Sequence, residues 1–326
     1  MQGAALALAE QIGDPDMIAA ANGSAAAPLY LSGRLAEALE SAQRSIGADR
    51  IKTVWSKFAH YTVSADQVAA FALFLLGYPD QAERANRAEL ERARRSGHGA
   101  PAVASEELNA GIRSSFLYIP MHRPDRVRDL ARPALEAAEQ AGLAFESARS
   151  RVFLGWAIAR LGNPDEGIAM IRSGIAHASA TGANATILIA VALPDALVTA
   201  ARYGEARVTL DEVLSNPDYP SPFVLTAEVH RLKGAAILGR DPSATADAEN
   251  CFRKAIEVAR SQSARWWELR ATVSLARLLR DTNRRDEART MLAEIYGWFT
   301  EGFDTADLKD AKALLEELGD PGGATR

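Results

Sequence analysis

The chain has 326 residues, 48% of them hydrophobic and 24% charged, which excludes a disordered polypeptide. Its net charge of -5 lacks the basic excess expected of a protein that binds nucleic acid or an anionic membrane. The lone cysteine, Cys251, excludes an intrachain disulfide scaffold. No basic stretch precedes the apolar N-terminal residues, and the most apolar run, 185–193, is far shorter than the roughly 20 residues that span a bilayer. We therefore expect a cytoplasmic protein.

A pattern of small and apolar residues recurs along the chain at intervals of 39 to 45 residues. In each copy a turn precedes a helix that carries a small residue, with further mostly apolar residues four and eight positions later. Positions i, i+4 and i+8 lie along one helix face, so each copy is expected to bury that face against a partner. The small-residue position is occupied in chain order by Ala38, Ala82, Val127, Gly167, Ala206, Ala248 and Ala288.

Helix-start signals and the intervening segments complete the repeating unit. Pro-Asp dipeptides begin at Pro79, Pro124 and Pro164, and proline suits the first helical position because the missing N–H would have no partner there. Between successive copies lies another apolar helix, as at 68–77, 148–162 and 268–281. The unit is therefore a helix–turn–helix of about 40 residues, repeated seven times.

One such hairpin cannot bury its own apolar face, whereas stacked neighbours can. We predict an all-α fold, a right-handed α-solenoid of about seven helix pairs, as a single domain over 1–318 with a frayed tail at 319–326. Pro194 predicts a kink or break in the first helix of the fifth pair. A capping helix over 304–318 is expected to bury one side, formed by Leu308, Ala311, Leu315 and Leu318. An apolar N-terminal edge is expected to expose Leu6, Leu8, Ile12 and Ile18.

These repeats resemble the tetratricopeptide repeat, in which a small residue stands four before a large apolar one in the second helix. Ala248, Phe252 and Ala255 match this pattern best. Leu154-Gly155 and Ile158 are similar to the Leu-Gly-Tyr pattern of the first helix, with Ile in place of Tyr. The period exceeds the family's value of about 34 residues, as it does in the longer variant of large bacterial signalling proteins.

Residues 264–318 closely resemble the C-terminal arm of multidomain bacterial proteins, and 228–238 match the same arm. In those proteins the arm follows a class III adenylate/guanylate cyclase or another output domain, as in related transcriptional regulators, and a predicted ATPase. This sequence has no cyclase-like α/β segment and no G-x-x-x-x-G-K-[ST] loop. The resemblance implies a non-catalytic protein-interaction or sensory domain, the regulatory arm of such a signalling protein. A free-standing adaptor that scaffolds partners is the alternative.

No chemistry-bearing constellation emerges from the polar residues. The histidines do not pair at helical spacing, and neither H-E-x-x-H nor G-x-S-x-G occurs. We therefore predict no catalytic residues, no metal and no cofactor. The aromatic residues Trp266-Trp267, Trp298-Phe299 and Phe303 are predicted to pack the last pair against the capping helix, and an aromatic binding pocket is the alternative.

The first helices line the groove of such a solenoid, so their polar and aromatic residues are candidate binding residues. Arg270, Arg277 and Arg280 lie roughly on one side of one helix, where they can receive carboxylates of an acidic partner. A solvated face with i,i+4 charge pairs is the alternative. We expect a protein or peptide partner, with no role for nucleic acid or membrane. The groove candidates are Arg149, Trp156, Glu228, Arg231, Arg270, Arg277 and Arg280.

Overall fold

The computed structural model describes residues 2–45, 64–96, 111–180, 186–216 and 223–319. These residues form helices and turns without a strand, and none of their helices has the length and apolar character needed to cross a membrane. Ile46 and the tail beyond Gly319 lie outside the described residues. Besides a helical stretch at 111–118, the helices are α1 (Gln2–Ile12), α2 (Pro15–Leu31), α3 (Leu35–Ser45), α5 (Ala65–Leu76), α6 (Pro79–Ser96), α8 (Pro124–Gln140), α9 (Ala144–Arg160), α10 (Pro164–Ala180), α11 (Thr186–Thr199), α12 (Tyr203–Ser215), α13 (Thr226–Arg240), α14 (Thr245–Ser261), α15 (Arg265–Asp281), α16 (Arg285–Tyr296) and α17 (Ala306–Gly319).

Seven helix pairs follow one another along the described chain, which confirms the predicted solenoid. They are α2/α3, α5/α6, 111–118/α8, α9/α10, α11/α12, α13/α14 and α15/α16, with α1 before the first pair and α17 after the last. The three predicted Pro-Asp starts open α6, α8 and α10. The predicted capping helix is α17, although it buries Leu314 where the sequence predicted Leu315.

A residue in the left-handed conformation ends the first helix in six of the seven pairs. The residue that follows it donates its backbone N–H to the carbonyl five positions back, as from Tyr78 to Leu73 (2.9 Å) and from Arg202 to Leu197 (2.8 Å). This Schellman arrangement satisfies carbonyls that the end of a helix leaves open. Each left-handed residue stands five positions before the small residue of its repeat, and the six are Gly33, Gly77, His122, Gly162, Ala201 and Asn283.

The buried stripe of each second helix follows a slightly different spacing from the predicted one. The small residue and the residue four later are buried in all seven pairs. The third buried position in pairs two to seven is i+7, because seven residues at about 100° each nearly complete two turns whereas eight overshoot. Among these pairs, the predicted i+8 residue is buried only in the sixth pair, α13/α14, as Ile256. The i+7 residues are Glu89, Ala134, Gly174, Val213, Ala255 and Ile295.

The pair α9/α10 packs backbone against backbone through glycines. A Cβ atom added to Gly167 would lie 2.4 Å from the carbonyl oxygen of Gly155 and 2.6 Å from the backbone nitrogen of Ala159. One at Gly174 would lie 2.7 Å from the carbonyl oxygen of Ala148. The other repeats carry alanine or valine at the position of Gly167, so this is the closest helix contact of the solenoid that the stripe positions reveal.

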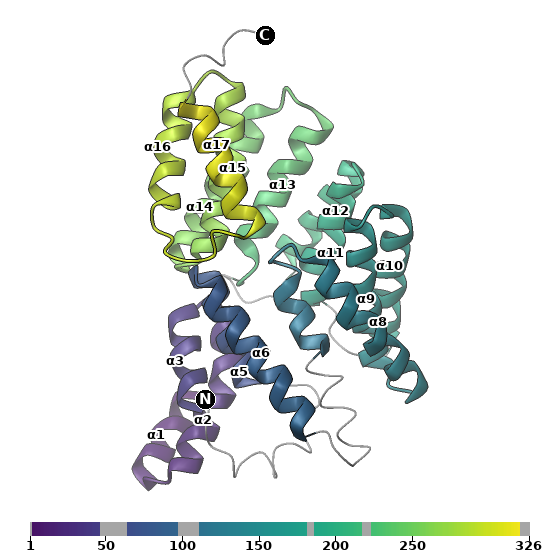
Figure 1. The fold of residues 1–326 in the computed structure, drawn as a ribbon, viewed down its shortest axis with the longest axis vertical. Helices are drawn as coiled ribbons and strands as arrows, with labels where there is room; N and C mark the ends of the chain where they lie inside the picture. The colour runs from purple at the N-terminus through teal and green to yellow at the C-terminus, as the bar shows by residue number, and fades with distance from the viewer. Residues whose placement is uncertain (1, 46–63, 97–110, 181–185, 217–222, 320–326) are drawn as a thin grey trace.

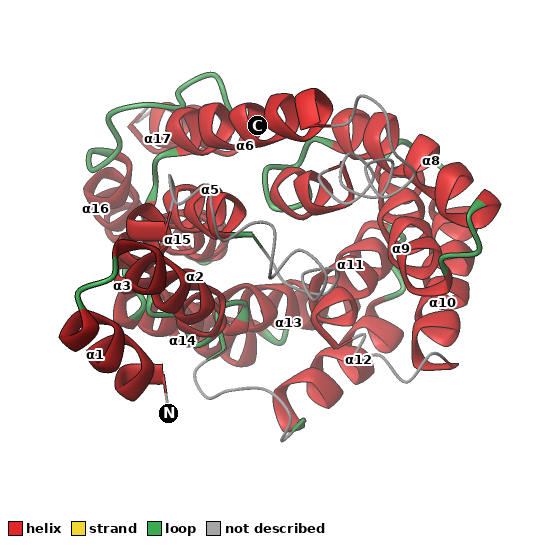
Figure 2. Cartoon of the chain, turned by 90° about the horizontal axis from the view of Figure 1, so that it is seen from below, coloured by secondary structure: helices red, strands yellow, loops and turns green. Residues whose placement is uncertain are grey.

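The pairs follow one superhelical turn, which brings the last pairs over the first. In Figure 1, α14 to α17 lie above α2 to α6, while α8 to α12 occupy the other side of the molecule. Figure 2 shows the helices arranged around a centre, with α9, α11 and α15 nearer to it than their partners α10, α12 and α16. The first helices therefore line the inner, concave side.

This turn is closed by contacts between the second pair and the end of the chain, which we call the closure interface. The ring of Phe74 lies 4.7 Å from that of Trp266, and the ring of Tyr78 lies 5.6 Å from that of Trp298. The carboxylate of Glu301 accepts backbone N–H groups of Asp80 (3.0 Å) and Gln81 (3.1 Å) at the start of α6. An open ladder, in which each repeat touches only its neighbours, lacks such contacts.

The aromatic residues of the last pair are packed rather than arranged as a pocket. Trp266, Trp267 and Phe299 are buried, which confirms the packing interpretation. Their partners include α5 as well as α17, because the superhelical turn returns α5 to this end of the molecule. Phe303 is exposed, and its ring contacts Tyr296.

Two further expectations concern single helices. The sequence predicted a kink or a break at Pro194, and the break is wrong, because α11 runs through Pro194 from Thr186 to Thr199. Proline removes one backbone hydrogen bond, and the burial of Leu193 and Leu197 beside it holds the helix together. At the N-terminal edge Leu8 and Ile12 are exposed as expected, whereas Leu6 and Ile18 are half-buried.

Candidate functional site

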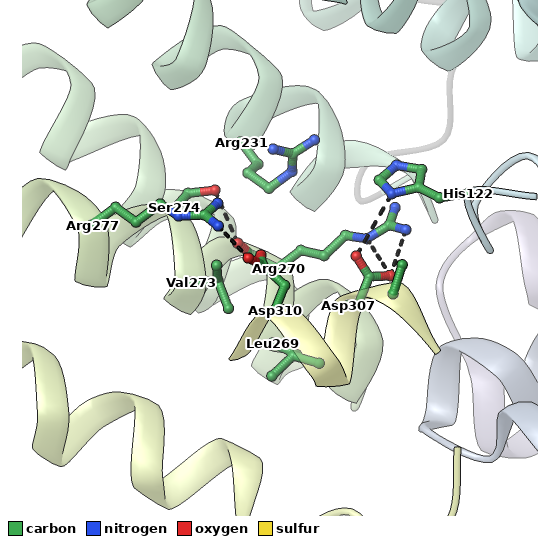
Figure 3. Close-up of a pocket in the computed structure, with 10 residues that line it drawn as sticks. His122, Arg231, Leu269, Arg270, Val273, Ser274, Arg277, Asp307 and Asp310 are labelled. Carbon is green, nitrogen blue, oxygen red and sulfur yellow. Dashed lines mark hydrogen bonds and ion pairs between the residues drawn. The ribbon is translucent and has the colours of Figure 1, made fainter. Parts of the chain in front are cut away.

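A cavity of about 240 Å³ lies between α13, α15, α17 and the turn that precedes α8 (Figure 3). Three arginines from α13 and α15, two aspartates from α17 and one histidine face it. Its lining residues are His122, Arg231, Leu269, Arg270, Val273, Ser274, Arg277, Ala306, Asp307 and Asp310.

Arg270 connects most of the charges around this cavity. Its side chain is 5% exposed, and its guanidinium donates to Asp307 Oδ2 at 2.7 Å and to the backbone carbonyl of Pro120. The same guanidinium lies 3.6 Å from the Glu228 carboxylate and 5.2 Å from the ring centroid of Trp267. The buried cation is thus fully surrounded by groups that stabilise its charge.

Asp307, at the start of α17, is the anionic counterpart of Arg270. It also accepts the indole N–H of Trp266 at 2.9 Å and lies 3.7 Å from His122 Nδ1. Burial alone would raise the pKa of this carboxyl, but the charge of Arg270 and the two hydrogen bonds hold the pKa below its usual value. Asp307 is therefore ionised in the folded protein at neutral pH.

Glu228 and Arg231 form a second buried ion pair on α13. Both guanidinium N–H···O distances are 2.7 Å, and Glu228 is 2% exposed. Burial opposes the charged form of Arg231, yet the adjacent Glu228 raises the pKa of Arg231 above its ordinary value. Arg231 is therefore charged, and Glu228 is its buried partner.

His122 occupies one of the left-handed turn positions, with a φ of 52°, where three of the other turns use glycine. Non-glycine residues rarely adopt this conformation, and when they do the strain often accompanies a functional role of the side chain. Burial and the charge of Arg270 lower the pKa of His122 well below its ordinary value. His122 is therefore neutral, which leaves one ring nitrogen as a hydrogen-bond acceptor at the cavity.

The structure brings four of the seven predicted groove residues to this region. Arg231, Arg270 and Arg277 line the cavity, and Glu228 binds Arg231 beside it. The carboxylate partners of the predicted arginine row are Asp307, Asp310 and Glu317 on α17 for Arg270, Arg277 and Arg280 respectively. The predicted charge pairs are therefore present, but their carboxylates lie on α17, two helices later, and not four residues away on α15.

Trp156, Glu228 and Arg270 do not form an open groove surface, contrary to expectation. Trp156 is fully buried, and its indole N–H donates to Asp195 Oδ2 at 2.7 Å. Glu228 is bound by Arg231 and lies 3.6 Å from Arg270, and Arg270 is in turn bound by Asp307 of α17. Arg270 still lines the cavity together with Arg231 and Arg277, whereas Trp156 and Glu228 do not belong to its lining.

Arg149 lies apart from the cavity, on α9. Its guanidinium carbon lies 5.8 Å from the ring centroid of Phe116 and 5.4 Å from that of Phe145. Burial, and secondarily the positive charge of Arg113, lower the pKa of Arg149 to about 10. The side chain is half-buried between aromatic rings, which distinguishes it from the arginines that carboxylates hold.

The sequence predictions missed the residues that complete the site, namely His122, Asp195, Asp307 and Asp310. One signal was present, because Asp195 follows Trp156 by 39 residues and so occupies the same place one repeat later. Asp307 likewise follows Arg270 by 37 residues. Polar contacts between successive helices of the inner side are thus indicated by pairs of complementary residues one repeat apart.

Comparisons with known proteins add little to this geometry. No family model matches the chain, and no curated protein matches it. Among solved structures, the crystal structure of the P58(IPK) TPR domain aligns over 90% of this chain and 88% of that one, with 13% identity and a TM-score of 0.23. The structure itself defines the class: an all-α solenoid of tetratricopeptide-like helix pairs.

Proposed function

We propose that this chain is a non-catalytic protein-interaction domain that binds a segment of a partner protein on its concave side. The observation that carries the proposal is the convergence of Arg231, Arg270 and Arg277, from two successive first helices, on one cavity. Helical-repeat proteins use their concave surfaces for binding, and guanidinium groups recognise carboxylates with defined geometry. The strained His122 at the same cavity supports a selected binding surface.

A display library of random peptides, screened against the full chain, tests the proposal. Selected peptides are expected to be enriched in acidic residues and to bind the Ser274→Leu variant at least tenfold more weakly, because leucine fills part of the cavity. Ser274 suits this change because its hydroxyl donates only to the Arg270 carbonyl of its own helix.

Ser215→Leu is the matched control, since this exposed hydroxyl also donates only within its helix, to the Glu212 carbonyl. It is expected to leave binding unchanged. Equal affinity of the selected peptides for both variants would show that the cavity is not the binding surface.

We further propose that the domain acts as the regulatory arm of a cyclase/ATPase-type signalling protein. The resemblance of 264–318 to such arms supports this context, and so do the exposed apolar side chains of Leu8 and Ile12 on α1. In the proposed mechanism, a partner that binds one curvature of the solenoid better than another biases the attached output module. The alternative is a free-standing adaptor.

The mass of the native protein in its own cells separates these two contexts. A species much larger than 35.0 kDa supports the regulatory arm, and its output is then assayed with the arm present and deleted. A species near 35.0 kDa excludes the arm and leaves the adaptor.

A further inference from the structure

Arg149 differs from the other candidate arginines in having no carboxylate partner among the described residues. Arg231 and Arg270 each lie 2.7 Å from a carboxylate oxygen, and Arg280 lies 3.0 Å from one. No hydrogen bond or ion pair joins Arg149 to any described residue, and its contacts are the aromatic faces of Phe116 and Phe145.

Among the described residues, no carboxylate lies within ion-pair distance of Arg149. Glu146, one helical turn earlier, attracts it but lies beyond ion-pair distance, and the carboxylate of Glu89 is already bound to Arg113 at 2.9 Å. A cation that is removed from water without a counter-charge raises the free energy of the folded protein. An anion that binds Arg149 removes this cost, and the free energy released in this way contributes to binding.

The geometry also selects the kind of anion. Aromatic rings lie against the guanidinium, and a planar carboxylate binds guanidinium N–H groups along their common plane. Phe116 belongs to a row of aromatic side chains on successive first helices, with ring centroids 4.8 to 6.2 Å apart: Tyr30, Phe71, Phe116 and Phe153. The apolar surroundings strengthen an ion pair formed there and favour apolar neighbours beside the anionic group.

We propose that Arg149, between Phe116 and Phe145, binds an acidic side chain of the partner segment that is flanked by apolar residues. This inference rests on the proposed function and names the chemistry of the partner at one position. The proposal assigns the acidic side chain of the partner to Arg149. The arginines of the cavity wall differ from Arg149 because each already has a carboxylate partner within the domain.

Thermal unfolding of the full chain tests whether Arg149 lacks an internal partner. Arg149→Met is expected to leave the Tm within about 2 °C of wild type or to raise it, since no ion pair is lost. Arg231→Met is the matched comparison and is expected to lower the Tm by at least about 4 °C, because the buried Glu228 loses its closest cation and both of its short hydrogen bonds. A similar loss in Arg149→Met would reveal a counter-ion within the chain and overturn the proposal.

Binding is tested with two acetylated and amidated peptides, Ala-Phe-Glu-Phe-Ala and its counterpart with Gln in the centre. The Nε–Hε NMR signal of Arg149, assigned by its loss in Arg149→Met, is expected to shift saturably with the Glu peptide only. Equal shifts with both peptides, no shift with either, or a shift with inorganic phosphate alone would overturn the assignment to an acidic side chain.

The peptides selected by display separate this inference from the proposed function. We expect them to bind Arg149→Met at least tenfold more weakly than wild type. If they bind Arg149→Met as tightly as wild type but lose affinity for Ser274→Leu, the Arg149 site is refuted and the proposed function stands. If affinity is unchanged in both variants, both are refuted.

Discussion

At the scale of single residues, the charges of the concave side depend on one another. Arg270 contacts Asp307 on α17 and lies near Glu228 on α13, while its remaining donor binds the Pro120 carbonyl. Each of these groups is shielded from water, so each relies on Arg270 for solvation of its charge or dipole. Arg270 thus contributes to the stability of the fold as well as to the lining of the cavity.

Replacement of Arg270 by methionine is expected to lower the free energy of unfolding by about 3–5 kcal/mol, because Asp307 and Glu228 lose their shared buried cation. Chemical denaturation measures the change. Arg280→Met is the control: it breaks a more exposed pair with Glu317, so the loss is expected to stay within about 1 kcal/mol. Equal losses would contradict the central role of Arg270.

His122 predicts a pH dependence of stability. Burial and Arg270 lower its pKa, and Arg160 and Arg231 act in the same direction while Asp307 opposes them. The folded protein therefore binds fewer protons than the unfolded chain below about pH 6.5, and stability falls as the pH is lowered from 7 to 5. The slope from this residue is at most about 1.4 kcal/mol per pH unit.

His122→Asn is expected to flatten this dependence, since asparagine tolerates the left-handed turn and does not titrate. Urea unfolding at several values between pH 5 and pH 7 measures the slope. His230, whose pKa burial also lowers, remains in the variant and accounts for the residual slope. Parallel curves for wild type and variant would show that His122 does not contribute.

At the scale of elements, one rule governs six of the seven helix pairs: a left-handed turn residue is followed five positions later by a small residue at the helix crossing. The space for the side chain of this small residue is smallest in α9/α10, where Gly167 faces the backbone of α9. Backbone atoms cannot move aside as a flexible side chain can, so this crossing admits no additional carbon atom.

Gly167→Ala introduces the residue that most other repeats carry at this position, yet it is expected to destabilise the protein by about 1–3 kcal/mol through overpacking. Gly204→Ala, in α12, is the matched control because a Cβ added there would meet no atom within 4 Å. It is expected to stabilise the helix by about 0.5 kcal/mol. Thermal unfolding compares the two, and a stable Gly167→Ala would disprove the close crossing.

The sequence predicted the elements well because the helix pairs are determined locally. Small residues such as Ala38 and Ala82, proline at helix starts, and apolar periodicity all act within a few turns of helix. The closure interface was not predictable in this way, since Phe74 meets Trp266 only when slight rotations between pairs sum to a full turn. The groove prediction found the arginines but missed Asp307, which lies one repeat after Arg270, and His122, which the superhelical turn brings from the third pair.

At the scale of the whole molecule, the closure interface fixes the superhelix. Trp298→Ala removes an indole that packs against Gly77 and Tyr78 and beneath the guanidinium of Arg265. The variant is expected to lose about 1–3 kcal/mol of stability and to show a larger radius of gyration by small-angle X-ray scattering. Phe303→Ala, in the same connection but exposed, is expected to change neither quantity. An unchanged radius in Trp298→Ala would contradict the role of this contact.

The closure interface also alters how the molecule should come apart. In an open array of repeats, each terminal unit has a single neighbour, so the ends fray first and unfolding advances inward through partly folded forms. Here the second and seventh pairs hold each other, and neither can detach alone without exposing Phe74 and Trp266. From the second pair to the seventh, the described helices therefore form a closed ring, and opening it at one point removes support at another. Such a chain unfolds in one step, with amide protons of α5 and α15 exchanging together despite their separation in sequence.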